Sequence, residues 1–268
     1  MSFLKRIFYF SLASSICLCT ELNAKPIYLS CNAKQAIQLI QKFKLLSVET
    51  LKDEQMENRA DCIQLNDSQI LITTANITGK KQDHYKIAID LIDVNNQKQL
   101  INYQHPQLIS EENGRFSSVK FDRVPYSNLQ NENVIGLKIH HLNNGYFSYD
   151  LDKLNLFRIV YNSSSVKNNK IQWILKNIST QINSSWRPTY ECDEGTTDEI
   201  KSILILKDSQ NHQLQDILLK QTKKSVDTDG KCKTKRVNQT QQQLLKFNGD
   251  SYQINRKLLL ISEDLKAE

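Results

Sequence analysis

The apolar residues of this chain follow two periods, and the change comes at Cys62. Before it, apolar side chains recur at spacings of three and four residues, as on one face of an amphipathic helix. They are Ala33, Ala36, Ile37, Ile40 and Phe43. Ser30 or Asn32 can cap the start of this helix, which we expect between residues 30 and 46. Residues 49–60 are good helix formers with little apolar face, and they predict either a second short helix or an exposed loop.

After Cys62, apolar and polar residues alternate with a period of two, which is typical of β-strands. The predicted strands are residues 69–75, 85–94, 98–103, 116–122, 134–142, 151–161, 170–178, 199–207, 214–224 and 242–247. Between them lie turn-forming sequences such as Asn143-Asn144-Gly145 and Asn248-Gly249, so successive strands should fold back as antiparallel hairpins. We therefore expect a mainly β fold of antiparallel hairpins or a meander, sandwich-like or propeller-like, with one N-terminal amphipathic helix.

The first residues have the pattern of a signal peptide. Lys5 and Arg6 precede a twelve-residue apolar run, Ile7–Leu18, which is shorter than the roughly 20 residues that a membrane-spanning helix needs. Polar residues then supply a spacer, so we expect cleavage after Ala24 and a periplasmic or secreted protein. Cleavage after Cys19 is the alternative. No long apolar run follows, so no membrane span is expected after removal of the signal.

The chain has 268 residues, of which 39% are hydrophobic and 24% charged, with only 7 Gly and 4 Pro. This composition excludes a collagen-like protein, a coiled-coil rod and a Pro/Gly-rich linker. Beyond the signal peptide at residues 1–24, we expect an N-terminal helix plus β region at 25–124 and a C-terminal antiparallel β region at 134–268. The polar stretch at 125–133 would separate them, although the two regions can also pack as one domain.

Four cysteines remain after residue 24, an even number in an oxidising compartment. They are Cys31, Cys62, Cys192 and Cys232. Three pairings are open, and we favour Cys31 with Cys62 and Cys192 with Cys232, because each pair joins neighbours within one half of the chain. A zinc site is the competing interpretation, but no pair has the close spacing that structural zinc sites use.

The formal net charge of +6 is spread along the chain, with one tight basic cluster. That cluster is Lys231, Lys233, Lys235 and Arg236. It could meet anionic lipid, glycan or an acidic protein, but a solvated strand face next to a turn explains it more simply. Because aromatic residues do not interleave with these charges and the protein is expected to be exported, nucleic acid is not an expected partner.

Two groups of residues could carry chemistry. On a strand over 134–142, His140 and His141 point to opposite faces, so they cannot easily bind one metal ion. Asp150 and Asp152 share a face if their segment is extended, and paired carboxylates can divide acid and base roles. Asp150, Asp152 and His141 are therefore the group we nominate for a hydrolase. The segment 227–230 resembles part of a calcium loop but lacks a third acidic ligand and a downstream glutamate, so it predicts a β-turn.

Other catalytic signatures are missing from the sequence. It contains no G-x-S-x-G elbow, no G-x-G-x-x-G fingerprint and no Walker loop. The cysteines are expected to be oxidised, which removes a thiolate nucleophile. We therefore expect no metal and no cofactor, and we assign no catalytic residue.

Four short sequences carry a resemblance. FDRVPYSN (121–128), VIGLKIHH (134–141), LNLFRI (154–159) and LKFNGDSYQI (245–254) resemble a group of exported proteobacterial proteins with a terminal F-[DN]-G-x-x-Y hairpin. The resemblance implies a periplasmic location and a β-rich body. It assigns no activity to any residue.

These observations favour a periplasmic, non-catalytic binding or envelope-accessory module, whose partner would be an envelope protein or a glycan. An inhibitor or immunity protein against a secreted toxin is a close alternative. A glycan or peptide hydrolase is the alternative from another class. Six Asn-x-Ser/Thr sequons also keep a eukaryotic secreted glycoprotein open.

Overall fold

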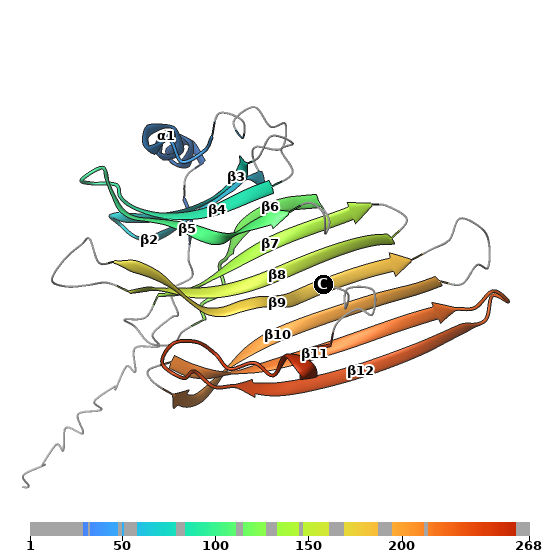
Figure 1. Cartoon of the computed structure of the whole chain (residues 1–268). Coiled ribbons are helices and arrows are strands. Elements are labelled where there is room, and N and C mark those ends of the chain that lie inside the picture. The colour runs from blue at the N-terminus through green and yellow to red at the C-terminus, as the bar shows by residue number, and fades with distance from the viewer. Residues whose placement is uncertain are drawn as a thin grey trace, which may run out of the picture.

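The computed structural model describes residues 29–31, 33–47, 50, 58–78, 84–110, 115–126, 133–144, 147–160, 169–186, 195–211 and 214–260. In this part of the chain, two antiparallel β-sheets and the helix α1 (Ala33–Phe43) build the fold (Figure 1). The expected mainly β fold with an N-terminal helix is confirmed. No helix within these residues is long and apolar enough to cross a membrane.

The first sheet is a meander in which each strand pairs with the next. Among the described residues it contains β1 (Leu29–Ser30), β2 (Ala60–Asn66), β3 (Gln69–Thr78), β4 (His84–Asp93) and β5 (Lys98–Ser110). Local side chains shape its turns, as predicted for polar turn residues. Asp93 Oδ1 accepts hydrogen bonds from the backbone N–H groups of Asn95 and Asn96, at 3.0 Å each, and so fixes the turn between β4 and β5.

The second sheet is also a meander, and its described strands run from β6 to β12. They are β6 (Arg115–Asp122), β7 (Val134–Asn144), β8 (Phe147–Val160), β9 (Lys170–Trp186), β10 (Gly195–Asn211), β11 (Leu214–Thr228) and β12 (Thr234–Leu245). A short 3-10 helix, Arg256–Leu258, follows near the end of the described chain. The chain changes sheet between β5 and β6, before the polar stretch at 125–133, and the predicted domain boundary there stays a prediction.

The two sheets pack face to face, in a sandwich-like arrangement, and α1 covers the outer face of the five-stranded sheet (Figure 1). The core between the sheets includes Ile63, Leu71, Ile89 and Leu91 from one sheet and Phe116, Val119, Ile135, Phe157 and Ile171 from the other. Under α1, Leu39 and Ile40 pack against Ile70, Ile72 and Ile92. Ile37, which we assigned to the buried face of this helix, is half exposed, and Leu39 takes its place in the core.

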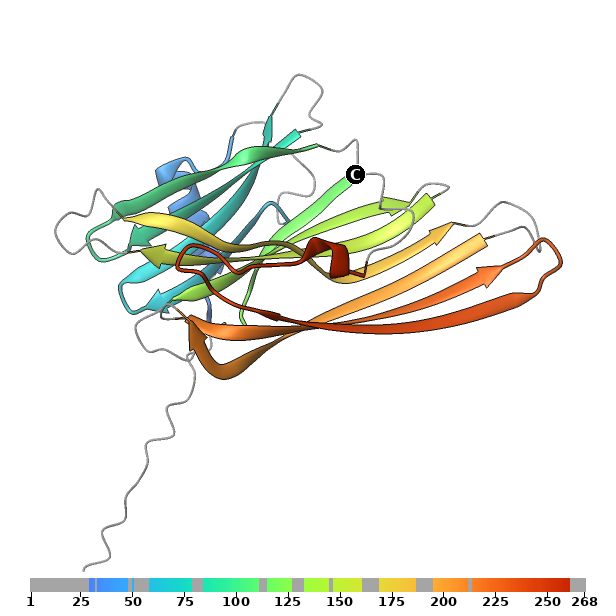
Figure 2. The same ribbon diagram turned by 60° about the horizontal axis from the view of Figure 1, so that its bottom comes forward.

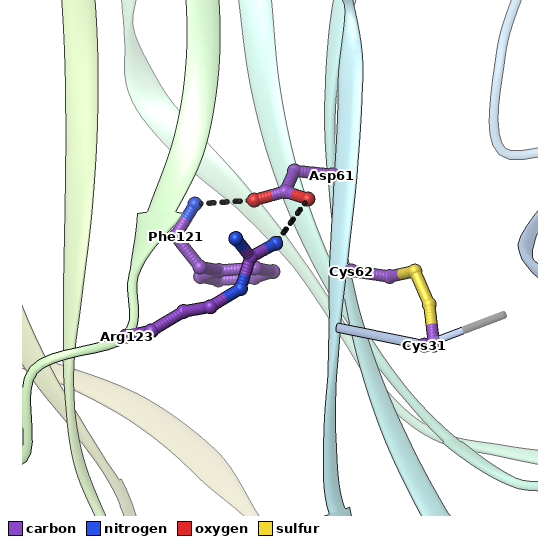
Figure 3. The surroundings of a disulfide bond; sticks show 5 residues. All are labelled: Cys31, Asp61, Cys62, Phe121 and Arg123. Atoms are coloured by element: carbon purple, nitrogen blue, oxygen red, sulfur yellow. Dashed lines mark hydrogen bonds and ion pairs between the residues drawn. A yellow bond between two sulfur atoms is a disulfide. The ribbon is translucent and has the colours of Figure 1, made fainter. Parts of the chain in front are cut away.

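Strand β2 ties these layers together (Figure 3). Cys62 forms the predicted disulfide with Cys31, with the two Cα atoms 5.7 Å apart. The preceding residue, Asp61, points towards β6, where its carboxylate accepts a hydrogen bond from the backbone N–H of Phe121 at 2.8 Å and pairs with Arg123 at 3.3 Å. The disulfide therefore holds the β1 and α1 side of β2, and Asp61 holds its other side to the second sheet.

The seven-stranded sheet opens between β9 and β10. These strands pair only over residues 181–186 and 196–201, and beyond this stretch they diverge (Figure 2). A second hydrophobic cluster, which includes Leu154 and Leu219, fills the gap. Tyr252 closes it, because its N–H donates to Ile174 O of β9 and its hydroxyl donates to Gln215 O of β11, both at 2.7 Å.

Candidate functional site

The adjacent histidines of β7 lie on opposite faces of the sheet, as the strand period predicts. His141 is buried, and its ring lies edge-on to Phe116 in the core between the sheets. Burial is the main reason that the pKa of His141 falls to about 4, and the positive charge of Lys153 adds to the shift. His141 is therefore neutral and enclosed at physiological pH.

Asp150 and Asp152 share the other face, where they meet His140 and not His141. His140 Nδ1 lies 2.8 Å from Asp152 Oδ1 and 3.5 Å from Asp150 Oδ1. The hydrogen bond to Asp152 raises the pKa of His140, and the same bond lowers the pKa of Asp152. The nominated trio of Asp150, Asp152 and His141 does not form one group, because β7 directs His141 into the core.

The His140 cluster resembles an ion pair on a sheet face more than a reaction centre. Its members are partly exposed, with side-chain exposures of 27% for His140, 44% for Asp150 and 30% for Asp152. No group of three or more metal-ligating side chains suited to a metal ion occurs among the described residues. A pair of this kind on an exposed sheet face contributes little free energy of folding.

Cys232 and the basic cluster lie at one end of the second sheet, around the turn between β11 and β12. Cys232 is disulfide-bonded, whereas Cys192 lies outside the described residues, so the pairing of these two stays a prediction. The turn between β11 and β12 is fixed by Asp229, whose Oδ1 accepts hydrogen bonds from the N–H groups of Lys231 and Lys233 at 2.9 Å each. Because backbone N–H groups donate to this carboxylate oxygen, Asp229 acts as a residue of the β-turn that the sequence predicts.

The sequence FDRVPY and the glycine of VIGLKIHH form a close-packed structural unit. The hydroxyl of Tyr126 donates to Asp122 Oδ2 at 2.7 Å, and Lys138 Nζ lies 3.0 Å from the same oxygen. A Cβ atom on Gly136 would lie only 2.8 Å from both Asp122 and Tyr126, so the tyrosine can pack here only on a glycine. The sequences behind the resemblance therefore include contacts that hold the fold.

A pocket of about 320 Å³ lies on the α1 side of the five-stranded sheet, beside the C-terminal end of α1. Its described lining is Phe43, Lys44, Leu45, Leu46, Ser47, Asn76, Thr78, Lys86, Ala88, Asp90, Gln99, Asn102 and Gln104. We call it the Asp90 pocket. Its volume is at the small end of the range of about 300 to 1,000 Å³ that is usual for ligand sites.

The alternation of β4 creates this pocket. Ile89 and Leu91 point into the core between the sheets, whereas Ala88, Asp90 and Ile92 point towards the α1 side. Ile92 lies in the apolar cluster under α1. The helix ends before it reaches Ala88 and Asp90, so this part of the sheet face becomes the floor of the pocket.

Hydrogen bonds hold the rim of the pocket in place. Asn76 Oδ1 accepts from the N–H of Ser47 at 2.6 Å, and Asn76 Nδ2 donates to Leu45 O at 2.8 Å. Thr50 Oγ1 accepts from the N–H of Ile77 at 2.9 Å and lies 2.8 Å from the Ser47 hydroxyl. The loop after α1 is therefore fixed to β3, and the rim is formed before any ligand arrives.

Asp90 is buried at the floor, with only 1% of its surface exposed. Gln99 Nε2 and Asn102 Nδ2 each donate to Asp90 Oδ1 at 2.7 Å. No donor from the described residues reaches the second oxygen, Oδ2. Burial raises the pKa of Asp90 to about 6 from its ordinary 3.8, although the two amide donors act in the opposite direction.

Sequence reasoning missed this site. Asp90 interrupts an apolar strand, in the sequence IAIDLIDV, and three amide residues follow on the next strand, in KQLINYQ. A carboxylate in the middle of such a strand, followed by amides that can reach it across a hairpin, is the signal that could have found it. What the pattern did not show is that α1 ends short of this residue.

Comparison with known protein families, with curated proteins and with solved structures finds no match to this chain.

Proposed function

We propose that this protein is an exported, non-catalytic binding module that recognises its ligand, or a macromolecule that carries the ligand, through the Asp90 pocket. The observation that carries this proposal is the unpaired Oδ2 of a buried aspartate on a pocket floor. Burial of the Asp90 carboxylate costs free energy of folding, and the two amide donors to Oδ1 offset only part of this cost. A ligand that donates to Oδ2 would recover this free energy.

The lining favours binding over turnover. Among the described residues that form it, Asp90 is the only carboxylic acid, and neither histidine nor cysteine is present. The Ser47 hydroxyl is engaged with Thr50 in the rim. A hydrolase of the usual kinds needs a second carboxylate or a base beside a nucleophile, and these lining residues do not supply such a pair.

The signal-peptide pattern and the Cys31–Cys62 disulfide support the export compartment, and the resemblance to exported proteobacterial proteins favours the periplasm. In that compartment the natural partners are envelope proteins and glycans. The preformed rim and the sheet floor give a rigid site, which lowers the entropy cost of binding.

Affinity capture from crosslinked native envelope tests this proposal. Residues 25–268 would be immobilised with the disulfides intact, in three forms: wild type, Asp90→Asn and Asp67→Asn. Asp67 is exposed in the turn between β2 and β3, so it matches the change in charge without touching the pocket.

We expect the same molecule to be retained by wild type and by Asp67→Asn and to be lost from Asp90→Asn. Equal retention by all three forms, or no retention by folded wild type, would contradict a binding role for the pocket.

A further inference from the structure

The chemistry of the Asp90 pocket also indicates the class of its ligand. We propose that the pocket binds a neutral saccharide ring, either free or at the end of a glycan. This inference rests on the proposed binding function and adds the substrate class to it.

The lining carries charges of both signs, which fits a neutral ligand that both donates and accepts hydrogen bonds. Lys86 and Lys44 line the pocket together with Asp90, so a cationic ligand would meet two ammonium groups and an anionic ligand would meet the Asp90 carboxylate. Neither side-chain ammonium group has a hydrogen bond or an ion pair with a described residue. Lys86 is therefore available to donate to a ligand oxygen.

The polar groups of the lining include both donors and acceptors, which suits hydroxyl groups. Asp90 Oδ2 is an acceptor, and because Gln99 and Asn102 donate to Oδ1 through their NH₂ groups, their carbonyl oxygens can accept as well. Gln104 adds a complete amide that binds no other described residue. A hydroxyl group both donates and accepts, so neighbouring hydroxyls on a ring can satisfy such a set.

The rim supplies the apolar side of the site. Phe43, at the end of α1, lines the pocket together with Leu45 and Leu46. A sugar ring has C–H groups on its faces and hydroxyl groups around its edge. It can therefore lie against the aromatic rim while its edge meets the floor of the pocket. The volume of about 320 Å³ suits one or two rings.

Side-chain amide NMR tests this inference directly. The probes are D-glucose, D-galactose, D-mannose and N-acetyl-D-glucosamine, with N-acetyl-trialanine amide as the peptide control. The resonances to follow are the side-chain NH₂ groups of Gln99, Asn102 and Gln104. We expect at least one sugar to shift these resonances in a saturable manner and the peptide to leave them unchanged.

Variants then show whether the contacts are those of the pocket. Asp90→Asn should weaken binding of that sugar by tenfold or more, since it removes a charged acceptor. Gln104→Ala should weaken it severalfold, and because Gln104 is exposed this variant tests the site even if Asp90→Asn fails to fold. Asp67→Asn should bind as wild type does.

Three results would overturn the inference: no response to any of the four sugars, a response to the peptide alone, or sugar affinity unchanged in Gln104→Ala and in folded Asp90→Asn. If envelope capture still depends on Asp90 in these cases, the binding function stands and the saccharide class fails. If capture fails as well, both proposals fail together.

Discussion

Replacing Asp90 with asparagine should stabilise the folded protein at neutral pH. The carboxylate is buried, and its pKa in the folded state is about 6 against an ordinary value of 3.8. Asparagine has the same shape and keeps an oxygen that can accept from Gln99 and Asn102. Its NH₂ group would replace Oδ2, which receives no donor from the described residues, so the substitution removes a buried charge and few contacts.

The raised pKa fixes the sign and the size of this effect. Between pH 3.8 and about 6 the folded state binds a proton at Asp90 that the unfolded state has released. The contribution of Asp90 to stability therefore falls as pH rises through this window, and the loss is complete above pH 6. At about 1.4 kcal/mol for each pH unit, the difference between the two pKa values corresponds to about 3 kcal/mol.

Urea unfolding at pH 4, 5, 6 and 7.5 measures this contribution. The free energy of unfolding of Asp90→Asn minus that of wild type should increase by up to about 3 kcal/mol from the lowest to the highest pH. Asp67→Asn, the exposed control, should show no such trend. A difference that is independent of pH, or a variant that is less stable than wild type at pH 7.5, would refute the assignment of Asp90 as a buried, costly carboxylate.

Three further predictions concern other parts of the fold. In an NMR titration, His140 should titrate above its ordinary pKa and His141 should stay neutral down to about pH 4; the reverse order would contradict their assigned faces. Removing the Cys31–Cys62 disulfide by double substitution with alanine should lower the free energy of unfolding by about 4 kcal/mol in the chain-entropy model, and an unchanged urea midpoint would refute this. Gly136→Ala should cost about 1 to 3 kcal/mol in the same assay, because the added Cβ would lie 2.8 Å from both the Tyr126 ring and Asp122 Cβ, and wild-type stability would show that both neighbours can shift.

The period of two was sufficient to locate strands that contribute apolar residues to the core between the sheets. The predicted strands at 85–94 and 116–122 match β4 and β6 within one residue. It failed for most of β12, where only the last residues, from 242 onwards, were predicted. Residues 234–241 are almost entirely polar and lie at an edge of the sheet, so pairing with β11 and not burial makes them a strand. Hydrophobic alternation cannot detect such a strand.

The alternation of apolar and polar residues also did not predict the bends within β9. Its register with β8 shifts at three places, and Asn177 has a positive φ of 55°. Because each shift changes which residues share a face, the alternation along β9 is broken. The separation of β9 from β10, which creates the second hydrophobic cluster, therefore has no simple periodic signal.

Features that one strand encodes could be predicted for the sites, and features that depend on several elements could not. Which face each of His140, Asp150 and Asp152 occupies follows from the strand period, and the structure agrees. That His140 is the histidine paired with these carboxylates depends on the register between β7 and β8, which no single strand encodes. The Asp90 pocket depends on one more element, the point at which α1 ends over the sheet.

Native mass spectrometry of the protein purified without denaturation from its own cell tests the central claim most directly. Wild type and Asp67→Asn should each carry a ligand of one defined mass, and Asp90→Asn should not carry it. The mass should stay unchanged during prolonged incubation, because a binding module does not convert its ligand. The same ligand on Asp90→Asn, or a bound mass that changes with time, would contradict a non-catalytic site at Asp90.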